Sequence, residues 1–129
     1  MKEPTWFTLD EVFAIHERQI SRFGGSTGLR DQGMLESALA RAQNYGEPAP
    51  DMAALAAAYA FGVIKNHPFG DGNKRVGYVL ARVFLLKNSW DIEASVEEKY
   101  LTFYAVAAGE RSEEELAVWI RNHTQQVSE

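Results

Sequence analysis

The stretch His67-Pro68-Phe69-Gly70-Asp71-Gly72-Asn73-Lys74-Arg75 separates two strongly apolar helical segments of this chain. It contains an imidazole, a carboxylate, an amide and two adjacent cations. These groups match separate needs of phosphoryl or nucleotidyl transfer, namely a base for a hydroxyl, a metal ligand and positive charge opposite phosphates. The stretch is therefore a candidate phosphate-handling site.

The segments on either side of this stretch predict two helices. Residues 52–65 are apolar around nearly the whole helix, which is typical of a central position in the fold. Asp51 can cap the start of this helix, and Pro68 disfavours helical backbone at His67, so the helix should end at about residue 66. The second helix is predicted over about 73–87 from an apolar stripe with helical spacing, formed by Val76, Val79, Leu80, Val83 and Phe84.

Four further helices are expected from capping boxes and apolar periodicity. Thr8 with Glu11 starts a helix over about 8–22. A second helix carries the stripe Leu35, Ala38, Leu39 and Ala42, and ends in the turn-forming residues 45–50. Two more capping boxes, Ser95 with Glu98 and Ser112 with Glu115, start the last two helices, of which the earlier ends at Gly109.

These elements predict an all-α fold of about six helices, with the polar stretch as the loop between the third and fourth. The 129 residues fit one domain over residues 1–129. Residues 5–7 and 91–93 could form a minimal strand pair, but we do not expect it. The tail, 124–129, is expected to be frayed.

Composition excludes several functional classes. A net charge of −5 argues against direct binding to nucleic acid. The sequence has no apolar run of membrane-spanning length and no signal-peptide core, so a cytoplasmic location is expected. It has no cysteine, which excludes disulfides and thiolate chemistry. Positive charge is nevertheless concentrated around the loop, at Lys65, Lys74, Arg75 and Arg82.

The first half of the loop suggests a base and a metal ligand. His67, at the end of a helix, is a candidate general base, although a lone histidine there is more often a surface residue. Asp71 can cap the following helix or hold Mg²⁺, because Mg²⁺ takes one or two protein carboxylates together with phosphate oxygens. Phe69 is expected to anchor the loop in the core.

The second half of the loop suggests an anion site. Gly70 and Gly72 allow close approach of the backbone to a ligand, and Asn73 can either donate to an anion or cap the helix. Lys74 and Arg75 are cations in the first turn of a helix, where the helix dipole disfavours positive charge, so we expect an anion to compensate them. Lys65 and Arg82 could extend the positive rim of this site or could simply be solvated surface residues, and both alternatives remain open.

The nine residues match the H-x-F-x-[DN]-[AG]-N-K-R motif of the death-on-curing (Doc) branch of the Fic/Doc superfamily. The sequence also resembles the N-terminal signature of that family. The matching segments are Ile20-Ser21-Arg22-Phe23-Gly24-Gly25, Gly28-Leu29-Arg30-Asp31-Gln32-Gly33 and Leu35-Glu36-Ser37-Ala38-Leu39. The resemblance covers essentially the whole chain and implies the compact helical Fic/Doc fold.

The resemblance implies a toxin of a bacterial or prophage toxin–antitoxin module, with ATP and Mg²⁺ as cofactors. The family prototype is a kinase that phosphorylates a threonine of elongation factor Tu and halts translation. By this resemblance His67 is the catalytic base and Asp71 the Mg²⁺ ligand. Asn73, Lys74 and Arg75 would contact the phosphates, with Gly70 and Gly72 in the phosphate-binding backbone. A protein hydroxyl of a translation factor would be the substrate.

Two other functions remain as alternatives. Fic proteins transfer AMP, and their motif has glycine at the position of Lys74 and a second arginine at that of Tyr78, so lysine favours the kinase. The second alternative is a non-catalytic module for antitoxin binding or regulation. Such a module would show an eroded motif, whereas the motif here is intact at His67, Asp71, Asn73 and Arg75. The glutamate helix that inhibits Fic proteins has no good match, since Ser89 and Glu93 are followed by Ala94. We therefore expect a separate antitoxin whose segment folds into a groove.

Three features outside the loop have ordinary structural interpretations. His16 lies on an apolar stripe and is expected to be a satisfied core or interface histidine. His123 ends the last helix, where a cation is favoured by the dipole. Residues 24–31 could position a target peptide or simply turn the chain, and the turn is preferred.

Overall fold

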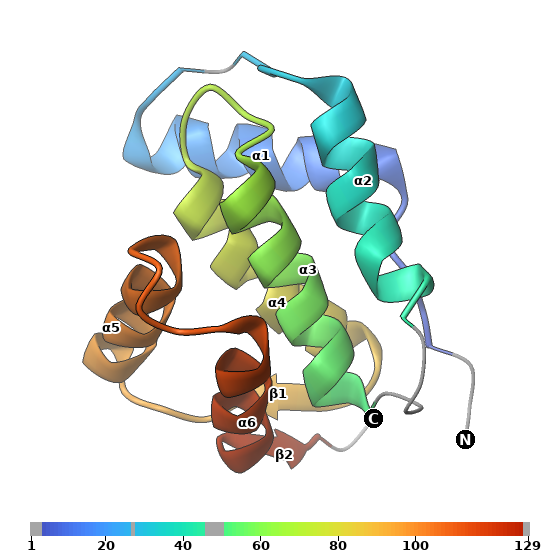
Figure 1. Ribbon diagram of the computed structural model, residues 1–129, viewed down its shortest axis with the longest axis vertical. Helices are drawn as coiled ribbons and strands as arrows, with labels where there is room; N and C mark the ends of the chain where they lie inside the picture. The colour runs from blue at the N-terminus through green and yellow to red at the C-terminus, as the bar shows by residue number, and fades with distance from the viewer. Residues whose placement is uncertain (1–3, 27, 46–50, 128–129) are drawn as a thin grey trace.

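The computed structural model describes residues 4–26, 28–45 and 51–127, which form six helices and one two-stranded antiparallel ribbon (Figure 1). This confirms the predicted helical, single-domain fold. None of the helices in these ranges is long and apolar enough to cross a membrane. The elements are α1 (Leu9–Phe23), α2 (Gln32–Gln43), α3 (Met52–Asn66), α4 (Asn73–Lys87), β1 (Trp90–Ile92), α5 (Val96–Ala107), α6 (Glu113–Asn122) and β2 (Thr124–Gln126).

Helix α3 is the centre of the fold, as its all-round apolar sequence predicted. It packs against α2, α4 and α6, and nearly all of its side chains are buried. Small residues allow the close packing: a Cβ atom at Gly62 would lie 3.0 Å from the carbonyl oxygen of Ala38 in α2, and one at Gly77 of α4 would lie 2.8 Å from Cγ1 of Ile64. The loop between α3 and α4 is thereby carried by two closely packed helices.

The capping residues explain where most helices start. Thr8 and Ser112 form complete capping boxes, and the Asp51 carboxylate accepts from the backbone N–H of Ala54 at 2.9 Å. The box expected at Ser95 is only half formed. Ser95 accepts from the N–H of Glu98, but the Glu98 carboxylate turns to α6. There it accepts from the indole N–H of Trp119 at 3.2 Å, because a buried indole N–H needs a partner.

The C-terminal tail corrects one expectation. Residues 124–126, expected to be frayed, form β2 and pair with β1, with Ile92 opposite Thr124 and Trp90 opposite Gln126. The end of α6 brings these residues beside β1, where the pairing satisfies backbone hydrogen-bonding groups of both strands. Residues 5–7 take no part in the ribbon. Residues 46–50, expected to end the second helix, and 128–129 of the tail lie outside the described ranges.

Candidate active site

His67 occupies an unusual backbone position at the junction between α3 and the loop. It adopts the left-handed conformation, with φ 52° and ψ 51°, and its N–H donates to the carbonyl of Val63 at 3.0 Å. Helix α3 ends at Asn66, as Pro68 predicted. Non-glycine residues rarely adopt positive φ, and such residues persist only where the surroundings fix them. The side chain of His67 is exposed.

The segment 28–31 fixes that backbone from the outside. The Arg30 guanidinium donates through Nε to the His67 carbonyl at 2.7 Å and through Nη2 to the Asn66 carbonyl at 2.9 Å. The backbone N–H groups of Arg30 and Asp31 both donate to the carbonyl of Pro68, and Gly70 donates to that of Gly28. Residues 28–31 therefore do more than turn the chain. They brace the loop, a role that the sequence analysis missed.

Phe69 and Asn73 brace the loop from the inside. Phe69 is 1% exposed, which confirms it as the core anchor. The buried Asn73 side chain accepts from the N–H of Phe69 at 3.0 Å and donates to its carbonyl at 2.9 Å. Of the two roles considered for Asn73, helix cap or anion donor, the structure shows no cap. Its amide ties the loop into one closed turn.

His16 of α1 lies against this turn. It is 4% exposed, its ring stacks on that of Phe69, and its Nε2 lies 3.1 Å from the Asp71 carbonyl oxygen. Because a carbonyl only accepts, Nε2 is the donor. This confirms the interpretation of His16 as a satisfied core histidine. The contact also gives it a part in the site, because it holds the backbone of Asp71.

Asp71 does not cap α4. Its carboxylate is exposed, and accepts from the N–H of Gly72 at 2.9 Å and from that of Ser26 at 3.4 Å. The cap position is Gly72, at φ 79°, and no side chain caps the helix. The first amides of α4 therefore face the loop with no side-chain acceptor, which is the arrangement that binds anions at helix N-termini.

The two cations of the loop point to different neighbours. The Lys74 ammonium lies 4.6 Å from the ring centre of Tyr104 and 5.6 Å from that of Tyr100, both on α5. The Arg75 guanidinium carbon lies 4.5 Å from the ring centre of Phe23, at the end of α1. Neither contact uses up the positive charge, because an aromatic ring carries no net charge.

Arg82 and Lys65, the other two cations that lie around the loop in the sequence, have partners elsewhere. Arg82 is paired with Asp91 at 3.2 Å, and this hydrogen bond raises the pKa of the guanidinium. Lys65 lies 5.6 Å from the ring centre of Phe61. The structure thus keeps Lys74 and Arg75 beside the loop and assigns Arg82 and Lys65 to local contacts.

The metal expectation fits the available ligands. Within the described ranges no three or more histidine and acidic side chains cluster so as to hold a metal ion. A metal site formed by protein side chains alone, as for catalytic zinc, is therefore not seen there. The exposed carboxylate of Asp71 beside the uncapped start of α4 is compatible with Mg²⁺, which shares its coordination between one or two carboxylates, phosphates and water.

The structure thus defines a helical domain whose histidine-containing loop joins its two central helices. The chain belongs to the Fic/DOC family, whose model matches residues 6–85. It is 34% identical over 114 residues to "Protein kinase doc" of Escherichia phage P1, covering 87% of this chain and 90% of that protein. It is also 38% identical over 78 residues to "Toxin Doc" of Mycolicibacterium smegmatis, covering 58% of this chain and 60% of that protein.

Proposed function

We propose that this protein is a Doc-type toxin that transfers phosphate from ATP to a serine or threonine hydroxyl of a bacterial translation factor, such as elongation factor Tu. The similarity to a protein named as a kinase extends over most of the chain. The observation that carries the proposal is the loop itself. His67 stands at one end and the uncapped start of α4 at the other, with the backbone between them braced from both sides.

In this proposal His67 accepts the proton of the target hydroxyl. Its imidazole is exposed, and among the described residues it has no hydrogen-bond partner, so a ring nitrogen is available to a substrate. The backbone on both sides of the ring is fixed, through Val63 on the N–H side and Arg30 on the carbonyl side. A base that is held in place but has a free ring suits proton transfer, because catalysis requires a defined geometry.

The phosphates would lie at the start of α4. The first amides of the helix and the glycine backbone at Gly70 and Gly72 would donate to them, with Arg75 and Lys74 beside them. The second N–H of the Asn73 amide would be a further donor. When bound through Asp71, Mg²⁺ would neutralise phosphate charge. Asp71 is held ready by the N–H groups of Gly72 and Ser26.

Two labelled nucleotides test the reaction class. The protein, Mg²⁺ and bacterial lysate are incubated in parallel with γ-labelled and α-labelled ATP, and the labelled product is identified by mass. We expect transfer of the γ label only, whereas transfer of the α label would indicate AMP transfer. His67→Ala and Asp71→Asn should each abolish the transfer. Undiminished transfer by the first variant would contradict the assignment of the base.

The toxin function requires a partner that neutralises it. We propose a cognate antitoxin whose segment folds into a groove of this domain, in the way that disordered segments fold on binding. Expression of the chain alone should arrest growth, and expression of its His67→Ala variant should not. If neither the wild-type chain nor the His67→Ala variant affects growth or labels any protein, a non-catalytic module is the better description.

A further inference from the structure

Two arginines from different helices share one exposed aromatic ring beside the loop. Phe23, the last residue of α1, is 57% exposed. The guanidinium carbon of Arg75 lies 4.5 Å from the centre of this ring, and that of Arg22 lies 5.7 Å from it. Arg22 and Arg75 are 53 positions apart in the sequence, so only the packing of α1 against α4 brings them together.

The described residues do not neutralise this pair. Within residues 4–26, 28–45 and 51–127 neither Arg22 nor Arg75 forms an ion pair with a carboxylate. The helix dipole favours Arg22 in the last turn of α1, but it disfavours Arg75 in the first turn of α4. Two guanidiniums against one ring also repel each other. An anion bound between them would remove both costs.

The end of α1 belongs to the wall of the loop. His16 donates to the Asp71 carbonyl, and a Cβ atom at Gly72 would lie 3.3 Å from Cδ1 of Ile20. Phe23 continues the same face of α1, with Arg22 next to it, and Ser26 just beyond donates to the Asp71 carboxylate. The side of the loop where α4 starts is therefore bounded by the last turn of α1.

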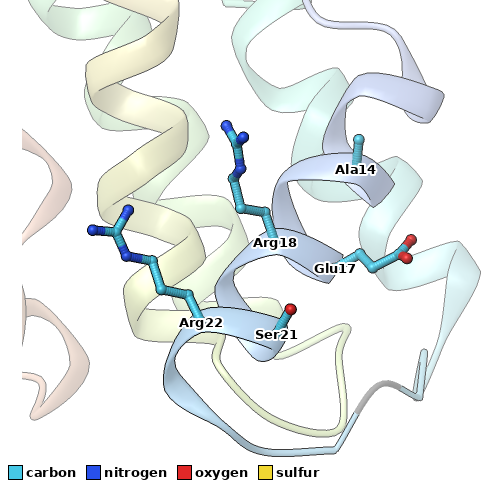
Figure 2. A pocket seen from close by; sticks show the side chains of 5 residues that line it. All are labelled: Ala14, Glu17, Arg18, Ser21 and Arg22. Carbon is cyan, nitrogen blue, oxygen red and sulfur yellow. The ribbon is translucent and has the colours of Figure 1, made fainter.

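The side chain of Arg22 is also exposed. Figure 2 shows Arg18 and Arg22 extending to the same side of α1, while Glu17 points away from both. These residues line a hollow of about 550 Å³ together with Ala14 and Ser21. All five come from one helix, so the hollow is a shallow depression and not a cleft. Arg18 lies one turn before Arg22, and in the described part of the chain the cations over the Phe23 ring are Arg22 and Arg75.

We propose that Arg22 is a second phosphate-binding arginine, which acts with Arg75 on the phosphates of the nucleotide across the shelf formed by Phe23. The inference rests on the proposed function, because it places the phosphates at the start of α4. A planar guanidinium can contact two phosphate oxygens at once, and two of them from opposite helices would fix the orientation of the phosphate chain. Binding would then depend on a residue outside the loop motif.

The test compares the affinity of four proteins for MgATP by isothermal titration calorimetry: wild type, Arg22→Gln, Arg22→Lys and Arg18→Gln. We expect the dissociation constant to rise about 10- to 100-fold in Arg22→Gln, which loses a charge-assisted contact. Arg22→Lys should be intermediate, because lysine keeps the charge and the dipole interaction but not the planar fork. Arg18→Gln should stay within about twofold of wild type.

Each outcome decides a separate point. If Arg22→Gln is as stable to heat as wild type and binds MgATP equally well, the inference is wrong and Arg22 is a helix-end cation only. If Arg18→Gln loses affinity as much as Arg22→Gln does, the effect is general surface charge, which also overturns it. If wild type itself binds no MgATP, the proposed function is wrong, and this inference, which rests on it, is wrong as well.

Discussion

The imidazole of His16 lies flat on the ring of Phe69, with centroids 3.8 Å apart and planes 7° from parallel. The same imidazole donates to the carbonyl of Asp71 at 3.1 Å. One buried side chain of α1 thus fixes both the core anchor of the loop and the backbone of its carboxylate. The loop is therefore held by the first helix as well as by the two helices that it connects.

We expect His16→Ala to destabilise the fold by about 2–4 kcal/mol, because it leaves a cavity under Phe69 and removes a donor from a carbonyl. His16→Phe keeps an aromatic ring in the stack and loses only the donor, so its cost should be smaller. Urea unfolding of both variants measures the difference. A change below about 0.5 kcal/mol in the alanine variant would show that the stack is unimportant.

We expect His67 to be required for phosphate transfer but not for the stability of the fold. At φ 52° a glycine relieves strain that an L-residue carries, so His67→Gly should unfold at the same or a higher temperature than wild type. Phosphate transfer should fall by about 10²- to 10⁴-fold, the usual contribution of a general base. His67→Asn, which tolerates positive φ, is the matched control for the backbone and should be equally inactive. A stable variant with full activity would exclude the role as base.

Arg30 should act through position and not through contact with the nucleotide. Removing its two bonds to the end of α3 in Arg30→Ala should cost about 1 kcal/mol of stability, since the bonds are exposed. The kcat for transfer should fall about 10- to 100-fold while the KM for ATP changes little, because the base is displaced. Arg18→Ala, on the exposed side of α1, is the control. An equal loss in both variants would argue for general charge.

Gly24 and Gly25 form a matched pair. Both have positive φ, at 86° and 120°, so each alanine variant should lose about 1 kcal/mol of stability. At Gly25 the new Cβ atom would also lie 2.7 Å from Oδ2 of Asp71, whereas nothing lies within 4 Å at Gly24. Gly25→Ala should therefore displace the carboxylate and raise the Mg²⁺ concentration needed for half-maximal transfer. A similar Mg²⁺ requirement in both variants would contradict the metal role of Asp71.

Asp51 should make stability depend on pH in the acid range. Its hydrogen bond with the Arg121 guanidinium lowers its pKa, so its contribution is fully present above the pKa of the unfolded chain and is lost as pH falls through the lower folded value. Asp51→Asn keeps the helix cap and removes the charge. We expect it to be less stable than wild type by up to about 1 kcal/mol at pH 7, because the pair is half exposed. Urea unfolding should show this gap closing as pH falls below the ordinary range of an aspartate pKa, through the lower folded value. A constant gap would contradict the ion pair.

The sequence was most informative where the deciding interactions are local. The apolar stripe from Val76 to Phe84 predicted α4 with its observed bounds, and Pro68 predicted where α3 ends. Both predictions succeeded because periodicity and backbone restriction act within a few residues. The buried anchor Phe69 followed from its place between two apolar helices. The motif also led to the correct family, because its spacing is specific.

The errors share a physical cause, since each depends on a partner far away in the sequence. Glu98 left its capping box for Trp119, 21 positions away, and residues 124–126 became a strand because α6 returns them to β1. Arg30 reaches the carbonyl of His67 across 37 positions. Contacts between residues so far apart in the sequence leave no signal in a local sequence pattern.

By itself, then, the sequence determined the helices, their order and the chemical groups of the loop, because backbone preferences and side-chain types are properties of neighbouring residues. Only the tertiary structure decided how those groups are held. It placed His16 under Phe69 and turned Arg75 to the ring of Phe23 beside Arg22. The packing of α1 against α4 sets these contacts, since burial in a dense core fixes positions that chain connectivity leaves open.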